Sequence, residues 1–389
     1  MTSTISHGDK PQFVSLLDIC SIQYGYAFDS KKFSENSNNG MPLVRIRDVV
    51  RGYTETYTSE SSVDPSYLVN EGDLLIGMDG EFNIAKWKSQ KALLNQRVCK
   101  LIPNDKVDAD YLYYFMPNAL KGIEDKTPFV TVKHLSAKEL NKVQVPLPPI
   151  KVQEEISLRI GQVEKLISLG KNILVKLDLL IKSQFMEMFG DPILNPQKWK
   201  VQKLNDVCIK INDGTHFSPE SFPHGEYKYI TAKNIRIWGL DLTKVTYVSE
   251  EIHRGIYERC DPKKGDVLYI KDGATTGIAI VNPLDEEFSL LSSVALLRPN
   301  TNQLTAIYLR DFLNYPAIYE KIRGSMAGAA ITRLTVAKIR QIEIPVPQLD
   351  LQKKYVIRRE QIDKSKFAVE ESIRKLELLK KALMQKYFG

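Results

Sequence analysis

The strongest constraint on the fold is an internal repeat. The segments KVQVPLPPIKVQEEI at 142–156 and QIEIPVPQLDLQKKY at 341–355 align without a gap, and Pro146 lies 199 positions before Pro345. Further pairs at this offset are Gln153 with Gln352, Arg159 with Arg358, Lys176-Leu177 with Lys375-Leu376 and Phe189-Gly190 with Phe388-Gly389. One offset kept over so long a stretch indicates a duplicated chain whose two copies share a fold.

Upstream of these segments the copies align more loosely. EGDLLIGMDG from Glu71 aligns with KGDVLYIKDG from Lys264, and RVCKLIP from Arg97 with SVALLRP from Ser293. Each copy is therefore a mixed domain followed by a helical segment, and a domain of this size can bury its own core. The expected boundaries are a tail at 1–10, a domain at 11–148, a long helix at 149–190, a domain at 191–347 and a second long helix at 348–389.

The helical segments carry apolar residues at spacings of three and four, which is typical of one stripe along a helix. The first stripe contains Ile156, Ile160, Val163, Ile167, Leu174, Leu177 and Ile181. The second is less regular: it contains Tyr355, Ile362, Phe367, Val369, Ile373, Leu376 and Leu383, while Leu379 and the charged Lys366 and Lys380 depart from it. Each helix is expected to span about 35 residues, or roughly 50 Å. The narrow stripes favour an antiparallel coiled coil between the two helices. The alternative is one long core helix in each domain.

Prolines before the helices and Gly190-Asp191-Pro192 after the first one are expected to delimit them. The domains between show short strand and helix patterns without a regular βαβ alternation, so the predicted fold class is α+β with two tandem mixed domains. Strands are expected at 42–50, 73–78, 96–102, 143–147, 227–235, 266–270, 294–299 and 342–346, and helices at 15–20, 110–120, 136–140, 203–208, 306–322 and 335–339.

Charge and composition exclude few classes of function. The net charge of +7 permits a nucleic-acid partner, but acidic and basic residues are interspersed. No apolar run is long enough for a membrane span, and the start lacks the features of an export signal, so a cytoplasmic protein is expected. The four cysteines show no CxxC pairing and are expected to be free, buried thiols.

The arrangement of these segments resembles that of a known protein family. The order of its parts is similar to that of the specificity (S) subunit of Type I restriction-modification systems: a domain, a P-x-P-P segment, a long helix, a junction, and then a second domain and a second helix. The junction runs from Phe189 through Gly190-Asp191-Pro192 and Asn195-Pro196 to Trp199. The resemblance extends from about Phe13 to Gly389. DGEFNIAKW and ALLNQRV in the first copy, and RGSMAGAAITRLTVAKI in the second, resemble segments of its target-recognition domains. The first copy departs where KGIEDKTPFVTVKHLSAKEL lacks the RGS triplet.

The resemblance implies a non-catalytic protein. Each domain is then a target-recognition domain for one part of an asymmetric, interrupted DNA sequence, and the long helices set the gap between the parts. The implied partners are double-stranded DNA, two methyltransferase (M) subunits and restriction-translocation (R) subunits. It also implies that S-adenosylmethionine, ATP and Mg²⁺ belong to those partners, so that this chain holds no cofactor and no metal.

Polar, Gly-containing connections are the candidate DNA-binding loops. In the first domain the candidates are Tyr26, Glu81, Asn83, Lys86, Lys126, Thr127, Lys133 and His134. In the second domain they are His216, Lys233, Asn234, Lys271, Thr275, Thr276, Arg323, Ser325, Met326 and Arg333. Gly80 and Gly273 are expected to allow a positive φ in a turn, and Asp79 and Asp272 before them to form these turns.

Two other classes of function stay open. One is a coiled-coil scaffold whose domains bind proteins. The other is a Mg²⁺-dependent nuclease, because Asp213 precedes Glu226-Tyr227-Lys228 in a loose carboxylate plus E-x-K arrangement. The sequence contains neither a P-loop nor the Gly-rich loop and [DNS]PP[YFW] motif of a DNA methyltransferase, and its five histidines lack ligand spacing.

Overall fold

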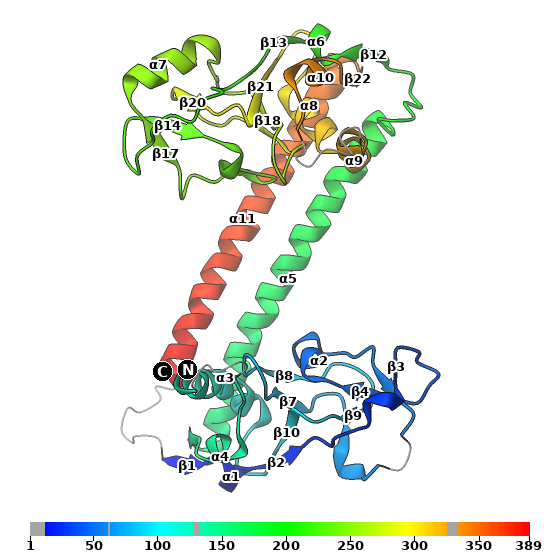
Figure 1. Ribbon diagram of the computed structural model, residues 1–389, viewed down its shortest axis with the longest axis vertical. Helices are drawn as coiled ribbons and strands as arrows, with labels where there is room; N and C mark the ends of the chain where they lie inside the picture. The colour runs from blue at the N-terminus through cyan, green and yellow to red at the C-terminus, as the bar shows by residue number, and fades with distance from the viewer. Residues whose placement is uncertain (1–11, 61–62, 128–132, 325–332) are drawn as a thin grey trace, which may run out of the picture. The chain divides into compact units, whose positions relative to one another are not determined.

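A computed structural model describes residues 12–60, 63–127, 133–324 and 333–389 of the chain. These residues form two compact units. Unit 1 comprises Met1–Lys171 and Glu371–Gly389, and unit 2 comprises Asn172–Glu370. Each unit contains one mixed domain and a segment of both long helices (Figure 1). Neither helix is therefore a unit of its own.

The two long helices are α5 (Ile150–Phe189) and α11 (Leu349–Phe388), each of 40 residues. At 1.5 Å per residue each is about 60 Å long, somewhat longer than expected. Helix α5 begins directly after Pro149 and is followed by Gly190, whose φ of 77° ends the helix as predicted.

The predicted apolar stripe is confirmed in α5, where all seven residues are buried or half-buried. In α11 the prediction for Phe367 is wrong, because its side chain is 67% exposed. The half-buried Lys366 takes the stripe position instead and pairs with Asp178 of α5. The charged Lys366, expected to depart from the stripe, thus has a cross-helix partner at that position.

Within each unit the two helix segments run antiparallel (Figure 1). In unit 1, Lys171 Nζ lies 3.5 Å from Glu377 Oε1, and Glu164 Oε1 lies 2.6 Å from Lys380 Nζ. In unit 2, Asp178 pairs with Lys366, and Arg358 donates to the sulfur of Met188. In both units a higher residue number on α5 faces a lower one on α11.

The domain of unit 1 is built on two main sheets and a two-stranded ribbon. The four-stranded sheet has the order β2 (Cys20–Tyr24), β10 (Val98–Pro103), β7 (Leu74–Gly77), β8 (Ile84–Lys86). The five-stranded sheet has the order β3 (Phe33–Ser34), β5 (Tyr57–Thr58), β4 (Met41–Val44), β9 (Ala92–Leu94), β6 (Leu68–Val69), and the ribbon pairs β1 (Phe13–Ser15) with β11 (Gln144–Pro146). The helices are α1 (Leu16–Ile19), α2 (Ile46–Arg51), α3 (Ala109–Lys126) and α4 (Ala137–Leu140), with short 3₁₀ turns η1 (Ser30–Lys32) and η2 (Pro65–Tyr67).

Unit 2 repeats the four-stranded sheet and the ribbon of unit 1, but its second sheet is smaller. Its four-stranded sheet has the order β13 (Cys208–Asp213), β21 (Val294–Pro299), β18 (Val267–Ile270), β19 (Ala279–Val281), and its three-stranded sheet the order β17 (Thr246–Val248), β14 (Tyr227–Ile230), β20 (Phe288–Leu290). The ribbons are β12 (Lys200–Lys203) with β22 (Glu343–Val346) and β15 (Ile235–Arg236) with β16 (Gly239–Leu240). The helices are α6 (Leu204–Val207), α7 (Glu250–Arg259), α8 (Ala306–Leu313), α9 (Pro316–Gly324) and α10 (Val336–Arg340), with a 3₁₀ turn η3 (Ala232–Asn234). A parallel pair occurs at the same place in each unit, β4 with β9 and β14 with β20.

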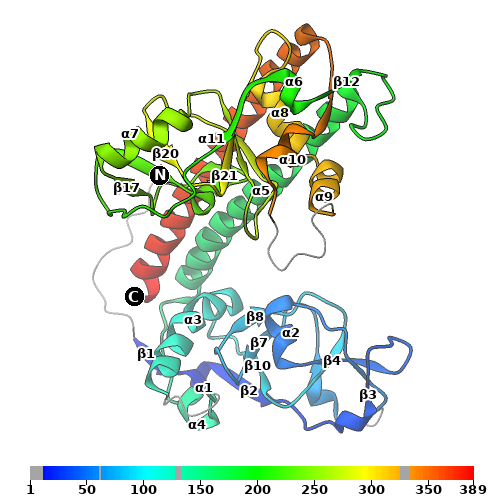
Figure 2. The same ribbon diagram turned by 45° about the horizontal axis from the view of Figure 1, so that its top comes forward.

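The four-stranded sheet of unit 1 lies between helices α3 and α2 (Figure 2), and an apolar core lies on each of its faces. Leu74 and Ile76 of β7 face the core that contains α3, whereas Leu75 between them faces the core that contains Val49 of α2. This alternation is the period-two pattern of a strand buried on both faces. In unit 2, Val267 and Leu268 divide between two cores in the same way.

Two predicted strands are shorter than expected. The segment 42–50 turns from β4 into helix α2, and the segment 227–235 turns from β14 into η3. In both, a side chain three residues on caps the bend, because Asp48 accepts from the amide of Arg45 and Asn234 from the amide of Thr231. Helix α7 was not predicted.

Matched hydrogen bonds confirm the duplication. The buried Gln153 accepts from the amide of Asp108 and donates to Pro148 O. The buried Gln352 does the same with Thr305 and Pro347. Each glutamine fixes the start of a long helix to its own domain.

The far ends of the helices complete the cores. Phe388, at the end of α11, packs edge-on against Tyr111 of α3 in unit 1, with ring centroids 5.2 Å apart. Phe189, at the end of α5, packs against Tyr308 of α8 in unit 2, with centroids 4.7 Å apart. Each unit therefore closes its core with the helix end that belongs to the other copy of the repeat.

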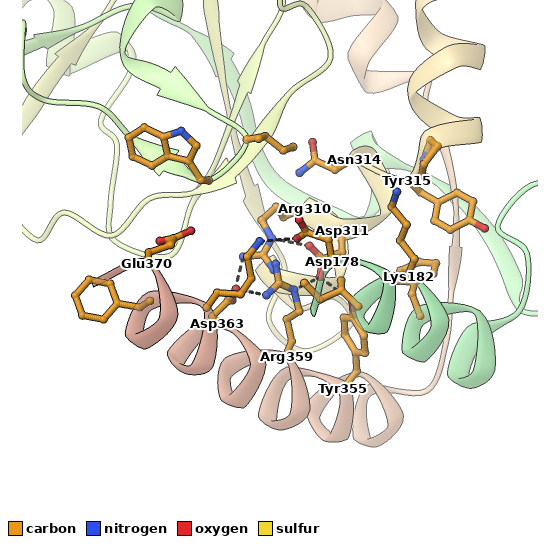
Figure 3. A pocket seen from close by; sticks show the side chains of 17 residues that line it. Asp178, Lys182, Arg310, Asp311, Asn314, Tyr315, Tyr355, Arg359, Asp363 and Glu370 are labelled. Atoms are coloured by element: carbon orange, nitrogen blue, oxygen red, sulfur yellow. Dashed lines mark hydrogen bonds and ion pairs between the residues drawn. The ribbon is translucent and has the colours of Figure 1, made fainter. Parts of the chain in front are cut away.

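A charged cluster fastens α11 to α8 in unit 2 (Figure 3). Asp311 accepts from Arg310 at 2.7 Å, from Arg359 at 3.1 Å and from the hydroxyl of Tyr355 at 2.7 Å. Arg359 also pairs with Asp363. The cluster lines a cavity of about 700 Å³ whose wall includes Trp238. Burial alone raises the pKa of Asp311, but the two guanidinium groups outweigh it and hold this pKa below its ordinary value.

All four cysteines are free thiols, as predicted. Cys20, Cys99 and Cys260 are buried, and burial raises the pKa of each to about 12. Cys208 is only half-buried, which differs from the prediction.

None of the helices in the described ranges is both long and apolar enough to span a membrane.

We expect Asp311→Asn to lower the free energy of unfolding by about 3 kcal/mol, because it leaves two buried guanidinium groups without their shared carboxylate. Since the folded pKa of Asp311 lies below its unfolded value of about 3.9, the wild-type contribution is present above pH 4 and is lost as the pH falls through the folded pKa. Urea denaturation at pH 7 and pH 3 measures both effects. Asp178, whose side chain is exposed, provides the control, since Asp178→Asn should cost less than about 1 kcal/mol. Equal losses in the two variants would contradict this role of the cluster.

We expect Gly25→Ala to destabilise unit 1 by about 2 kcal/mol or more, because an added Cβ would lie 2.0 Å from the carbonyl oxygen of Asn95. Gly214 occupies the matching place in unit 2, where a Cβ would lie 1.9 Å from Leu290 O. Gly122→Ala, in open space on α3, is the control and should be neutral or stabilising by about 0.5 kcal/mol. Thermal denaturation compares the variants, and a Gly25→Ala protein as stable as wild type would rule out this close approach.

Candidate nucleic-acid interface

In unit 1, four chain segments lie side by side at one end of the four-stranded sheet. Backbone amides join them: Gln96 N donates to Tyr26 O at 2.8 Å, Met78 N to Arg97 O at 2.9 Å, and Leu135 N to Met78 O at 2.7 Å. We call residues 25–26, 78–80, 95–97 and 133–135 the first loop edge.

Unit 2 contains the same arrangement. Ser292 N donates to Thr215 O at 2.8 Å, Lys271 N to Ser293 O at 2.9 Å, and Leu334 N to Lys271 O at 2.8 Å. We call residues 213–216, 271–276, 291–293 and 333–334 the second loop edge. The backbone is duplicated here, whereas the side chains differ between the two edges.

The first loop edge holds a carboxylate with two cationic or polar partners. Asp79 Oδ1 lies 2.6 Å from His134 Nδ1, and Asp79 Oδ2 lies 3.6 Å from Arg97 Nε. Arg97 Nη1 lies 3.2 Å from His134 Nδ1. Arg97 has a φ of 70°, an uncommon conformation for a residue with a Cβ. The backbone thus turns a half-exposed guanidinium toward the carboxylate.

The second loop edge holds a larger cluster around the buried Asp213. Its carboxylate lies 2.7 Å from Arg259 Nη2, 3.2 Å from His216 Nε2 and 3.4 Å from Lys271 Nζ. Lys271 is buried and also pairs with Asp272 at 3.0 Å. Asp272 in turn contacts Arg333 Nε at 3.4 Å. The result is a chain of alternating charges along the edge.

The turn predictions are confirmed only for the glycines. Gly80 and Gly273 have φ values of 77° and 103°, as the turns require. The side chains of Asp79 and Asp272 bind cationic or imidazole groups from other segments, which the prediction of turn-forming aspartates did not include.

The structure brings most of the predicted residues of the first domain to this edge or beside it. Tyr26, Lys133 and His134 lie on the edge, Glu81 and Asn83 lie in the turn from β7 to β8, Lys86 lies in β8, and Lys126 and Thr127 end α3. Lys133 Nζ donates to Glu124 O of α3 at 2.9 Å, which ties the edge to that helix end. Lys86 is paired with Asp110 inside the unit.

The predicted residues of the second domain divide by exposure. His216, Lys233, Thr275 and Arg333 are exposed, whereas Asn234, Lys271 and Thr276 are buried in hydrogen bonds or ion pairs within the unit. Arg323 is half-buried and donates to the carbonyl of Ala274 at 3.0 Å. Ser325 and Met326 lie outside the described residues.

Sequence reasoning missed Arg97, Arg259 and the ion-pairing role of Asp213. A signal for two of them was present. Arg97 begins the strand segment that aligns with Ser293 in the repeat, so a charged residue stood where the other copy has a small one. Asp213-Gly214 aligns with Tyr24-Gly25 around the close-approach glycine. Arg259 ends α7, for which unit 1 offered no template.

Two residues of the nuclease alternative are engaged in ion pairs. Asp213 is bound by cations, and Lys228 of the E-x-K triplet pairs with Glu286 at 2.7 Å. Within the described ranges no group of three or more His, Cys, Asp or Glu side chains is arranged to hold a metal ion. The arrangement suits recognition of a polar, anionic surface by paired guanidinium and imidazole groups.

Comparison with known proteins identifies the family. The profile of the Type I restriction modification DNA specificity domain matches residues 9–179 and 196–380. The chain is 29% identical over 393 residues to the EcoBI specificity subunit of Escherichia coli, covering 93% of this chain and 80% of that protein. It is 22% identical over 350 residues to the MjaVIII specificity subunit of Methanocaldococcus jannaschii, covering 83% and 82% of the two chains.

Solved structures support the fold. The S subunit of a Type I restriction-modification system from M. genitalium superposes with a TM-score of 0.65 at 14% identity, over 100% of this chain and 99% of that one. A chain from a structure on complex assembly and conformational transition of the type I R-M system gives 0.57 at 18% identity, over 99% of both chains. Since the family profile matches both copies of the repeat over most of their length, the chain belongs to the DNA specificity subunits of Type I restriction-modification systems.

Proposed function

We propose that the chain recognises an asymmetric, two-part sequence in double-stranded DNA, one part with each loop edge. The observation that carries this proposal is the duplicated edge with unlike side chains. The duplicated backbone carries Asp79, Arg97 and His134 in unit 1, and Asp213, His216 and Arg333 in unit 2. In unit 2, Arg259 at the end of α7 adds a guanidinium from outside the edge. Two copies of one fold with different donors and acceptors suit two different base sequences.

The basic side chains that are exposed next to each edge suit the DNA backbone. Lys126 ends α3 in unit 1, and Lys233 lies in η3 of unit 2. Contacts of this kind with phosphates give affinity and register without sequence preference, and the edge residues then add the sequence preference.

We further propose that α5 and α11 form an antiparallel coiled coil that sets the gap between the two recognised parts. The antiparallel pairs in each unit and the length of 40 residues per helix support this. A rod of about 60 Å exceeds the roughly 34 Å of one turn of DNA, so it is long enough to span a gap of that size.

In this proposal the chain catalyses nothing. It binds two methyltransferase subunits and, through the complex, restriction-translocation subunits. The chain itself holds no cofactor, while S-adenosylmethionine, ATP and Mg²⁺ enter with the partners. Family membership and the similarity to a chain from a study of type I R-M complex assembly support this division of roles.

We expect a complex of this chain with its methyltransferase partner to modify one bipartite motif. Single-molecule sequencing of DNA from cells that express both subunits identifies the modified bases. Binding of the purified complex to that motif should weaken steeply with salt, because basic side chains release counterions from the phosphates. An active partner that modifies no specific motif, or binding indifferent to both salt and sequence, would instead favour a protein-binding scaffold.

We expect a matched deletion of residues 168–174 and 371–377 to change the gap while leaving the two recognised parts unaltered. It removes one heptad from each helix together with the pair Lys171–Glu377, so the stripe keeps its phase. The helices shorten by about 10 Å, equivalent to about 3 base pairs. Motif sequencing should show a shorter gap or no modification, whereas the control Ser168→Ala with Lys375→Ala, at exposed positions, should keep the original motif. The original gap in the deletion variant would refute the spacer role.

A further inference from the structure

The two loop edges share a side-chain arrangement that their backbone equivalence does not require. In unit 1, Asp79 holds Arg97 and His134. In unit 2, Asp213 holds Arg259 and His216. Asp213 ends β13 and Arg259 ends α7, whereas Asp79 follows β7 and Arg97 precedes β10, so the two triads come from different positions of the repeat. The same chemistry has been assembled twice from unrelated segments.

In both triads the arginine is the exposed member of a supported pair. The side chains of Arg97 and Arg259 are 53% and 50% exposed, while those of Asp79 and Asp213 are 29% and 4% exposed. In each triad the histidine also contacts the guanidinium, at 3.2 Å from Arg97 Nη1 and 3.1 Å from Arg259 Nη2. Carboxylate and imidazole thus restrict the rotamers of a long side chain before any partner binds, which lowers the entropy lost on binding.

The other cations at the edges are less suited to this role. Lys271 is buried between Asp213 and Asp272 and supports them. Arg323 is half-buried, and its Nη1 donates to the carbonyl of Ala274. Arg333 is exposed and contacts the carboxylate of Asp272, but it has no histidine contact among the described residues. Arg97 and Arg259 alone among these combine exposure with support from both a carboxylate and an imidazole.

A guanidinium group offers donors only, in a planar fork. In the major groove, guanine presents two adjacent acceptors, O6 and N7, whereas adenine pairs an acceptor with a donor. A fork held in place therefore favours guanine over the other bases. A phosphate would also accept from a guanidinium, but it would not require a rotamer fixed from two sides.

We propose that Arg97 and Arg259 each recognise one guanine, the first in one part of the target and the second in the other part, with Asp79 and Asp213 as positioning residues. This inference rests on the proposed DNA-recognition function. Each bidentate contact is expected to discriminate against other bases by about 5- to 150-fold.

The test maps the modified motif of single variants co-expressed with the methyltransferase partner. Arg97→Ala should relax one G·C position in one part only, and Arg259→Ala one G·C position in the other part. Arg97→Lys, which keeps the charge but loses the fork, should relax the same position as Arg97→Ala. Arg51→Ala, an exposed cation at the end of α2 without such support, is the matched control and should leave every position unchanged.

The positioning role has its own readout. Asp79→Asn should keep the guanine preference but lower the extent of modification at limiting expression, and Asp79→Glu should restore part of it. Thermal denaturation of each purified variant shows whether it is folded. If Arg97→Ala is not folded, Arg97→Lys replaces it in the test of guanine recognition.

Three results overturn the proposal at different levels. An unchanged motif in a folded Arg97 variant refutes base recognition by this residue. Uniform weakening at all sequences, with the salt dependence reduced by about one counterion, reassigns Arg97 to a phosphate. If the wild-type complex itself modifies no motif, the proposed function fails rather than the assignment of these residues.

Discussion

The fold depends on an exchange of helix ends between the two copies of the repeat. Each domain starts its own long helix through a buried glutamine, Gln153 or Gln352, yet closes its core with an aromatic residue from the far end of the other helix, Phe388 or Phe189. A single copy would expose the apolar face that its partner helix covers. Duplication of the chain therefore provides more than a second recognition domain, because it supplies the helix end that each domain needs for burial of its apolar side chains.

Polar contacts along the helices distinguish one unit from the other. In unit 1 the hydroxyl of Tyr114 and the amine of Lys380 both bind Glu164. In unit 2 the corresponding region contains Asp311 between Arg310 and Arg359. A helix segment placed against the wrong domain would leave buried charges without partners, which is costly. Burial of the apolar stripe stabilises the packing of the helices. The different polar contacts in the two units specify which helix segment packs against which domain.

The sequence was informative where the repeat constrained it. The constant offset predicted two copies, both long helices and their ends, since Pro149 and Gly190 act through local backbone geometry. It was misleading where a tertiary partner decides. Phe367 was assigned to the apolar stripe but lies exposed, and its neighbour Lys366 pairs with Asp178 across the two helices. The bends at Asp48 and Asn234 depend on side-chain caps hidden in strand-like segments, and the triads of the loop edges join residues far apart in the chain. The two copies of the repeat align only loosely within the domains, so their alignment did not indicate these contacts.

Recognition by the loop edges, as proposed, requires a rigid support, and the exchanged helix ends provide it. Hydrogen–deuterium exchange of the full chain tests that exchange most directly. With Phe388→Ala, amides of α3 at 109–126 should exchange faster while those of α8 at 306–313 keep their protection, and Phe189→Ala should give the reverse. Unchanged protection of α3 in Phe388→Ala, or equal loss in both helices, would contradict the account.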